Sequence, residues 1–415
     1  MKHIGVIGGG IVGLSAAYYL RKAGYNVTII DQGNLDDGCS FGNAGMIVPS
    51  HFVPLAAPGM VAKGIRWMFD SESPFYVRPR LSRDLISWGM KFYRHANQRH
   101  VERSMPALSA LSQYSTACYR EWSKELPFDF GFQERGLLML YHDAELEKEE
   151  QETVRLAHRL GVEARVLTLS EIQQMEPDVR VTARGGVYYP GDSHLIPGVL
   201  VRNLISLLRQ QGVGFELNCP VSGFHEKNGE IGAVKTNRGE FTADAWVLAT
   251  GSWSGQVASL LGHRLPMQAG KGYSFTLNDV SRNIRIPSIF LEARVAVTPM
   301  GKALRFGGTM EITGIDHTIN MNRVRGIANS IRKYYPEMDV ALPKPEHVWH
   351  GLRPCSPDGL PYIGKTKLKK NLIFATGHSM MGLSLGPATG KLVSDLIQGE
   401  PASVDLSLFD PDRFN

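Results

Sequence analysis

Cysteine is scarce in this chain, with four residues among 415, and no two of them form a CxxC pair. This scarcity argues against a zinc site built from cysteines and against a redox dithiol, and we expect no metal centre. Few and widely spaced cysteines in a long chain are typical of a reducing compartment. We therefore expect a cytoplasmic protein.

A strong excess of one charge is also missing, because 45 basic residues face 40 acidic ones and leave a net charge of +5. So small an excess argues against a nucleic acid as the partner. The positive charge is nevertheless concentrated, since seven basic and two acidic residues lie between Arg78 and Arg103. Two interpretations stay open: a solvated face, or a contact with an anionic membrane surface or an acidic partner.

Uninterrupted apolar runs that would suit a membrane-spanning helix are absent as well. Segments 38–62 and 371–390 contain no Asp, Glu, Lys or Arg, but prolines and glycines interrupt both of them. We expect both segments to be buried around something apolar inside the protein. The run His3–Gly8 leads directly into further glycines without a small-residue cleavage site, so we interpret it as the first strand and not as a signal peptide.

The residues that are present have a globular composition, 43% hydrophobic and 20% charged, over a length that favours two or three domains. A strand at 3–8, a helix at 11–23 and a strand at 26–31 form a βαβ unit. The periodicity predicts further helices at 81–124, 143–160, 197–211 and 383–397, strands at 136–141, 245–250 and 372–376, and an antiparallel sheet of a second domain between 265 and 348. The predicted fold class is therefore α/β (α+β).

The turn of the βαβ unit, Gly8–Gly13, satisfies the GxGxxG pattern of dinucleotide-binding folds. Gly8 permits the tight turn, Gly10 lets the backbone approach a pyrophosphate, and Gly13 lets the helix pack on the strand. The phosphates would then face the N-terminus of the helix. Asp31 ends the second strand, where its carboxylate would accept hydrogen bonds from ribose hydroxyls and disfavour the 2′-phosphate of NADP.

Three further segments favour FAD over NAD. Small residues at 40–45 follow the second strand, Thr250–Gly251 ends another strand, and the glycine-rich turn 377–382 begins the last helix. A helix start at this turn would stabilise negative charge on the pyrimidine ring of a reduced flavin. A nicotinamide-dependent reductase would need a second nucleotide fingerprint, and the sequence contains one only.

These motifs identify a resemblance that spans nearly the whole chain. Its residues are GGGIVGLSAAYYL from Gly8, SFGNAG from Ser40, AAPGM from Ala56, KGYSF from Lys271, GLRPCSPDGLPYIG from Gly351 and TGHSMMG from Thr376. The chain resembles the D-amino-acid oxidase-like flavoproteins, and within them it is most similar to the bacterial D-amino-acid dehydrogenase branch. The resemblance implies a Rossmann-like FAD-binding domain (1–60, 145–175, 192–262, 350–415) interleaved with a substrate domain on a mixed, largely antiparallel sheet (61–144, 176–191, 263–349).

The motifs and the resemblance together predict the residues that bind FAD. They are Gly8, Gly10, Ile11, Val12, Gly13, Asp31, Gln32, Ser40, Asn43, Ala44, Gly45, Met46, Val221, Thr250, Gly251, Trp253, Gly377, His378, Met381, Gly382 and Leu383.

The resemblance also implies three candidate catalytic residues. Arg353 matches the arginine that pairs with the substrate carboxylate, a task suited to a planar guanidinium, although a structural salt bridge is the alternative. Tyr273 would line the same pocket and bond the carboxylate, or else be a tyrosine at the edge of the core. His378 meets the flavin at the last turn, as a packing residue more often than as a base.

Two positions depart from related branches of the family. Met380 stands where glycine-oxidase-like enzymes carry a second arginine, so a second guanidinium on the carboxylate is not expected. Gly351 stands where sarcosine-oxidase-like relatives attach flavin covalently, so we expect no Cys-linked flavin.

The function implied is oxidative deamination of a D-amino acid to a 2-oxo acid, with hydride transfer from Cα to flavin N5. A D-proline or 4-hydroxy-D-proline dehydrogenase giving a cyclic imine is an alternative, and a glycine or sarcosine-type oxidase a weaker one because of Met380. A flavin subunit that exchanges electrons with a partner chain is a further class. The electron acceptor would be a quinone, another carrier or oxygen, with a peripheral contact at the inner face of the cell membrane.

Overall fold

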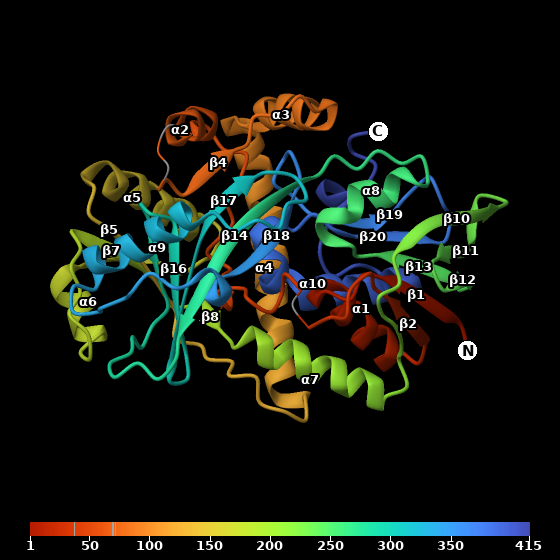
Figure 1. The fold of residues 1–415 in the computed structure, drawn as a ribbon, viewed down its shortest axis with the longest axis horizontal. Helices are drawn as coiled ribbons and strands as arrows, with labels where there is room; N and C mark the ends of the chain where they lie inside the picture. Colours follow the sequence, from red (N-terminus) through yellow and green to blue (C-terminus); the bar gives the residue numbers. More distant parts are fainter. Residues whose placement is uncertain (37, 69, 71) are drawn as a thin grey trace.

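Two sheets lie next to each other and carry the rest of the chain on their faces (Figure 1). The computed structural model describes residues 1–36, 38–68, 70 and 72–415. One sheet has six strands and the other has nine. The predicted α/β class is confirmed.

The six-stranded sheet is a Rossmann-like sheet in the order β19-β20-β13-β1-β2-β9, parallel except for β19. Alternation along β1 explains its two covered faces, because Ile4 and Val6 enter one apolar core and Ile7 enters another. Its strands are β1 (His3–Ile7), β2 (Asn26–Ile30), β9 (Gly214–Glu216), β13 (Ala245–Leu248), β19 (Tyr362–Lys365) and β20 (Leu372–Thr376).

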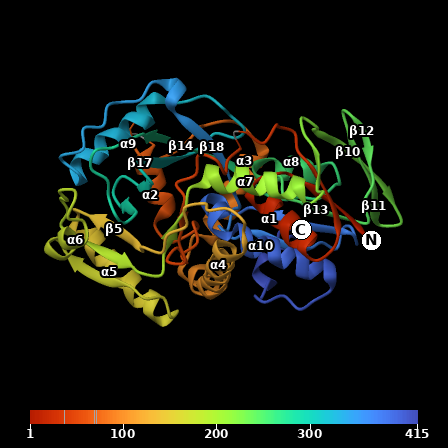
Figure 2. The ribbon, with the colours of Figure 1, turned by 90° about the horizontal axis from the view of Figure 1, so that it is seen from below.

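Helices cover one face of this sheet and a small antiparallel sheet covers the other (Figure 2). On the helical face α1 (Ile11–Lys22) packs along α10 (Gly382–Gln398), which also contacts α4 (Gln98–Glu125), and α7 (Pro197–Gln210) contacts α1. The opposite face carries α8 (Ser254–Ser259) and the strands β10 (Val221–Lys227), β11 (Glu230–Thr236) and β12 (Gly239–Phe241).

The nine-stranded sheet has the order β18-β14-β17-β16-β15-β5-β7-β6, with β4 paired to β17. Its strands are β4 (Phe75–Val77), β5 (Leu137–Tyr141), β6 (Arg165–Thr168), β7 (Gly185–Tyr189), β14 (Gln268–Leu277), β15 (Ser288–Phe290), β16 (Val295–Met300), β17 (Ala303–Ile312) and β18 (Trp349–Cys355). Beside it are α2 (Met60–Trp67), α3 (Arg83–His95), α5 (Ala144–Arg159), α6 (Leu169–Met175), α9 (Met321–Tyr334) and the two-stranded ribbon β3 (Met46–Ile47) and β8 (Ser193–His194). Short 3₁₀ turns lie at η1 (Gly251–Trp253), η2 (Pro345–His347), η3 (Ser379–Met381) and η4 (Ser407–Phe409).

Two expectations from the sequence differ from this topology. The stretch expected as antiparallel sheet contains helix α9, which buries Val324, Ile327 and Ile331 at helical spacing against the nine-stranded sheet. Residues 145–175, expected in the FAD domain, contain β6, which pairs with β7 in the nine-stranded sheet. Short charged segments of this kind carry little information about which sheet they will join. The division into domains otherwise stays a prediction.

No helix in the described ranges is long and apolar enough to cross a membrane. The expectation for segments 38–62 and 371–390 agrees with their position, because both contribute residues to the wall of one cavity of about 950 Å³.

Close packing at the first turn makes Gly13 a test of the fold. A Cβ at Gly13 would lie 1.9 Å from the carbonyl oxygen of Gly8, so Gly13→Ala must push α1 away from the turn. We expect a loss of about 1–3 kcal/mol in the free energy of unfolding, measured with urea. Gly89→Ala is the control, because its Cβ would meet nothing within 4 Å in the interior of α3. An equal effect of both substitutions would contradict this packing.

Candidate functional site

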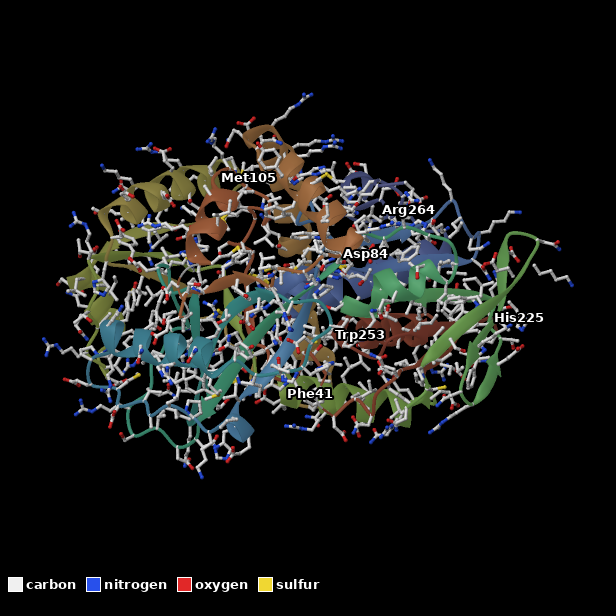
Figure 3. The ribbon with its side chains drawn as sticks, turned by 45° about the horizontal axis from the view of Figure 1, so that its top comes forward. Phe41, Asp84, Met105, His225, Trp253 and Arg264 are labelled. Carbon is white, nitrogen blue, oxygen red and sulfur yellow. The ribbon has the colours of Figure 1, made fainter. Side chains whose placement is uncertain are left out.

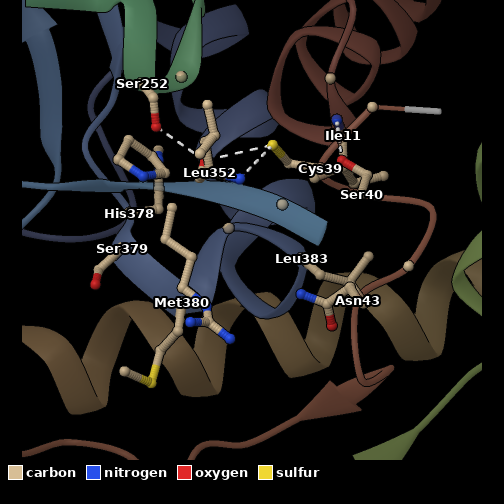
Figure 4. A pocket seen from close by; sticks show the side chains of 18 of the residues that line it. Ile11, Cys39, Ser40, Asn43, Ser252, Leu352, His378, Ser379, Met380 and Leu383 are labelled. Atoms are coloured by element: carbon tan, nitrogen blue, oxygen red, sulfur yellow. Dashed lines mark hydrogen bonds between the residues drawn. The ribbon is translucent and has the colours of Figure 1, made fainter. Parts of the chain in front are cut away.

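A cavity of about 950 Å³ lies where the two sheets meet. The β1–α1 turn, segment 38–60, the ends of β13 and β18, and the start of α10 all contribute to its wall. Figure 4 shows side chains from these segments around it, with Ile11 and Ser40 at one side and His378 and Met380 at another.

The N-terminus of α1 opens on this cavity without an acidic residue in its first turn or a side-chain cap from Gly10. Ser40 Oγ accepts a hydrogen bond from the Ile11 amide at 3.1 Å. A Cβ at Gly10 would approach nothing closer than Ser40 Oγ at 3.9 Å, so the space in front of Gly10 is open. Exposed amides and open space at a helix start suit a pyrophosphate.

Asp31 is held in place at the same edge of the cavity. Its carboxylate accepts hydrogen bonds from the amides of Gly9 at 2.6 Å and Gly33 at 2.7 Å. These bonds fix the orientation of the carboxylate and leave lone pairs on both oxygens for ribose hydroxyls.

A second uncapped helix start, that of α10, reaches the cavity at Met381, Gly382 and Leu383. Ser384 Oγ accepts a hydrogen bond from the Val48 amide at 3.0 Å, which ties segment 46–48 to this helix start. The arrangement fits a flavin, because the partial positive charge of the helix would face the ring that becomes anionic on reduction.

His378 is buried beside this helix start and is neutral. Burial lowers its pKa to about 3. Thr389 Oγ1 donates to the carbonyl oxygen of Leu385, so it accepts from His378 Nε2, which therefore carries the proton. The geometry favours the packing role for His378 over the role of a base.

Most of the predicted cofactor residues meet at this one cavity. Those in its wall are Gly8, Gly10, Ile11, Val12, Asp31, Gln32, Ser40, Asn43, Ala44, Met46, Val221, Thr250, Gly251, Trp253, His378, Met381, Gly382 and Leu383. Gly13, Gly45 and Gly377 lie behind the wall, where a Cβ would approach other residues to within 2.7 Å or less. The contacts of these residues with FAD stay a prediction.

Arg353 lies in the wall with no carboxylate within salt-bridge distance among the described residues. Its Nη1 donates to the carbonyl oxygen of Thr309, and burial lowers the pKa of the guanidinium. Gly272 on the neighbouring strand makes room for it, because a Cβ there would lie 2.2 Å from Nη2. The salt-bridge alternative is therefore not observed, and the guanidinium is available for an anionic ligand.

Tyr273 also lies in the wall, but its hydroxyl is already engaged. It donates to the buried carboxylate of Glu311 at 2.6 Å and accepts from the amide of Asn320 at 3.1 Å. Glu311 in turn lies 3.8 Å from Lys271 Nζ and 3.5 Å from Arg323 Nε. The single proton of this hydroxyl is thus committed to Glu311, and a bond from Tyr273 to a substrate carboxylate would require a change of partner.

The sequence prediction missed three histidines of the wall: His51, His317 and His350. His317 Nδ1 and His350 Nε2 are 3.1 Å apart, and the ring of His317 stacks near Trp253. His51 is the only ionisable residue in the charge-free segment 38–62 apart from Cys39, and that isolation was the available signal.

Gly10→Ala separates cofactor binding from folding. The new methyl group meets no protein atom closer than 3.9 Å, but it enters the space in front of the helix start. We expect FAD to bind at least about tenfold more weakly, equivalent to about 1.4 kcal/mol, when the FAD-free protein is titrated and flavin fluorescence is followed. Urea unfolding of the FAD-free protein should not change. Unaltered FAD affinity would contradict the assignment of the space in front of Gly10 to the cofactor.

Comparisons with known proteins agree with this geometry. Residues 3–396 match the DAO family, whose description is FAD dependent oxidoreductase. The chain is 31% identical to the D-amino acid dehydrogenase of Vibrio vulnificus (strain CMCP6), covering 97% of this chain and 98% of the relative. It is 32% identical to the enzyme of the same name from Paramagnetospirillum magneticum (strain ATCC 700264 / AMB-1), covering 99% and 98%.

Solved structures show the same fold at lower sequence identity. Glycine oxidase from Geobacillus kaustophilus has a TM-score of 0.79 at 22% identity, covering 100% of both chains. L-Proline dehydrogenase from P. horikoshii has a TM-score of 0.77 at 22% identity, covering 100% of this chain and 97% of the other. The family match, together with the two helix starts and the open space in front of Gly10, establishes that the chain belongs to the DAO family of FAD-dependent oxidoreductases.

Proposed function

We propose that this protein oxidises D-amino acids to imino acids, which hydrolyse to 2-oxo acids. The observation that carries the proposal is Arg353, a partly buried cation in the wall of the flavin cavity, for which the described part of the chain offers no carboxylate partner. A guanidinium in that setting binds a carboxylate strongly and in a defined orientation. The full-length similarity to D-amino acid dehydrogenases supports the D configuration.

The residues of the chain provide binding and orientation. Arg353 holds the substrate carboxylate, and its contact with Thr309 fixes the direction of the guanidinium. Apolar wall residues, among them Met46, Val48 and Met381, exclude water from the Cα–H bond. The two-electron oxidation would come from FAD when it is bound, as the acceptor of the Cα hydride. No side chain has to remove a proton from Cα in this scheme.

A cyclic D-imino acid such as D-proline or 4-hydroxy-D-proline is the second candidate substrate, supported by the similarity in fold to a proline dehydrogenase. A glycine or sarcosine-type oxidase is disfavoured, because Met380 at the cavity wall supplies no second cation.

The test of the proposed function is anaerobic reduction of the bound flavin by a panel of D- and L-amino acids that includes D-proline and 4-hydroxy-D-proline. We expect bleaching of the flavin absorbance by D-forms only. Absence of bleaching with every D-form would overturn the proposal and favour an N-methyl amine substrate or a subunit that needs a partner chain.

Arg353→Ala is expected to retain FAD but to weaken amino-acid binding by about 2–5 kcal/mol, because it removes one partner of a desolvated charge pair. The dissociation constant is obtained from the substrate dependence of anaerobic flavin reduction. Arg264→Ala, at an exposed arginine outside the cavity wall, is the control (Figure 3). The role of Arg353 would be contradicted if the flavin of Arg353→Ala were reduced at the same low substrate concentrations as that of the wild type.

For the electron acceptor we propose a membrane quinone, reached through a peripheral contact of α2 and α3. Ile86, Met90 and Tyr93 on α3 are 53%, 55% and 70% exposed and share one face of the helix. Leu81 before α3 and Ile65 on α2 are exposed as well, and the exposed arginines Arg78, Arg83 and Arg94 precede or belong to α3. An apolar face rimmed by basic side chains suits an anionic bilayer surface. Met60 and Trp67 of α2 belong to the cavity wall, so the cavity adjoins this surface.

Vesicle binding tests this contact. We expect sedimentation with vesicles that contain anionic lipid, weakened by salt and weakened about fivefold or more by Ile86→Glu combined with Met90→Glu, because each change adds a negative charge and removes apolar area. Leu342→Glu, at an exposed leucine elsewhere, is the control. Equal binding of all variants, or binding that does not depend on the anionic lipid content of the vesicles, would contradict the proposed surface.

A further inference from the structure

His51 is one of the polar residues of the cavity wall that have no role in the scheme above. It lies in the charge-free segment after β3, where its amide donates to the carbonyl oxygen of Val48 at 3.0 Å and closes a turn. Apolar residues that line the same cavity, Val48, Ile289 and Ala296, belong to one core cluster. A polar ring among these apolar side chains favours a ligand that carries a hydrogen-bonding group at this place.

The hydrogen bonds behind His51 determine which of its ring nitrogens carries the proton. Asp192 is 1% exposed and accepts two bonds from Ser50, from the amide at 3.1 Å and from the hydroxyl at 2.5 Å. The hydroxyl of Ser50 has one proton and gives it to Asp192, so its oxygen accepts the third bond, 3.1 Å long, from His51 Nδ1. The proton therefore resides on Nδ1, and Nε2 is an acceptor.

The ring stays neutral and Nε2 remains available to a ligand. Burial, assisted by the nearby cation Arg294, lowers the pKa of His51 to about 4. Burial raises the pKa of Asp192 to about 7, so at pH 8.5 its carboxylate is ionised and accepts from Ser50. No protein partner of His51 Nε2 is found in the part of the chain that the structure describes.

The positive charge of Arg294 limits which ligand groups can donate a hydrogen bond to His51 Nε2. Arg294 lies in the cavity wall and acts on His51, so a cationic group placed there would be repelled. An anionic group offers no proton to an acceptor nitrogen. A neutral donor satisfies both conditions, and a hydroxyl is the simplest such group on an amino-acid side chain.

We propose, on the basis of the proposed function, that the substrate is a D-amino or D-imino acid with a side-chain hydroxyl, which donates to His51 Nε2 while Arg353 holds the carboxylate. Ser50 and Asp192 are positioning residues, because they act by fixing the tautomer and the orientation of the imidazole. A substrate without the hydroxyl leaves Nε2 desolvated and unpaired, and it is bound less well for that reason.

The experiment compares three pairs of substrates that differ by the hydroxyl: 4-hydroxy-D-proline and D-proline, D-serine and D-alanine, and D-threonine and D-2-aminobutyrate. Anaerobic flavin reduction at pH 8.5 gives a dissociation constant and a limiting rate for each. For the pair that fits the cavity, the FAD-loaded wild type should prefer the hydroxylated member by about 5- to 150-fold, mainly in the dissociation constant.

Variants identify the origin of the preference. His51→Leu should bring the ratio close to one, Ser50→Ala should lower it while the imidazole is retained, and His51→Gln should keep most of it because an amide oxygen still accepts. His225→Gln, in the hairpin far from the cavity, should leave it unchanged (Figure 3). If the His51→Leu protein is recovered without flavin, the substrate ratio of Ser50→Ala tests the proposal in its place.

The proposal is overturned if D-amino acids reduce the wild-type flavin with a ratio near one for all pairs. It is also overturned if His51→Leu weakens both members of each pair equally, because His51 would then contact the amine that they share. Absence of reduction by any D-form is a different result, because it removes the proposed function itself.

Discussion

The close packing of α1 against α10 is the contact on which the rest of the site depends. A Cβ at Gly390 would lie 2.4 Å from the backbone carbon of Ser15, and a Cβ at Gly386 would lie 3.1 Å from Ile11 Cγ1. Because these glycines let the two helices approach closely, both helix starts open on one cavity. The amides of both helix starts then face a cofactor that carries negative charge at its pyrophosphate and, after reduction, at its ring.

Polar groups of the nine-stranded sheet meet this positive cavity in two different ways. Tyr273 donates to Glu311, and Lys271 beside them donates to Asp316 and Thr318, so these groups support the wall and leave little hydrogen-bonding capacity for a ligand. Arg353 contacts the backbone carbonyl of Thr309 and the sulfur of Met310, and the Thr309 φ of +69° is rare for a β-branched residue. Strain and an unbalanced charge gather where the substrate is expected, as is common at functional sites.

Local patterns anticipated much of this architecture. The short apolar run of β1, the glycines of the first turn and the helical spacing of α7 and α10 each specify an element within a few residues. Helix α9 and the strand β6 were not anticipated in their proper places, since the apolar spacing of α9 lies within a stretch rich in turn signals, and the register of β6 depends on β7, which lies 17 residues further along the chain. His51 was missed for a similar reason, because the Asp192 carboxylate that orients its partner Ser50 is distant in sequence.

The sequence alone determined the βαβ unit, the dinucleotide turn, the family and the identity of Arg353 as a candidate ligand, because these depend on residues that are close together along the chain. Only the tertiary structure decided that Arg353 has no carboxylate partner among the residues described, that Tyr273 has one, and which nitrogen of His51 is the acceptor. Each of these depends on a partner that folding brings from a remote segment. A side chain's chemistry follows from its type, but its availability follows from what is packed against it.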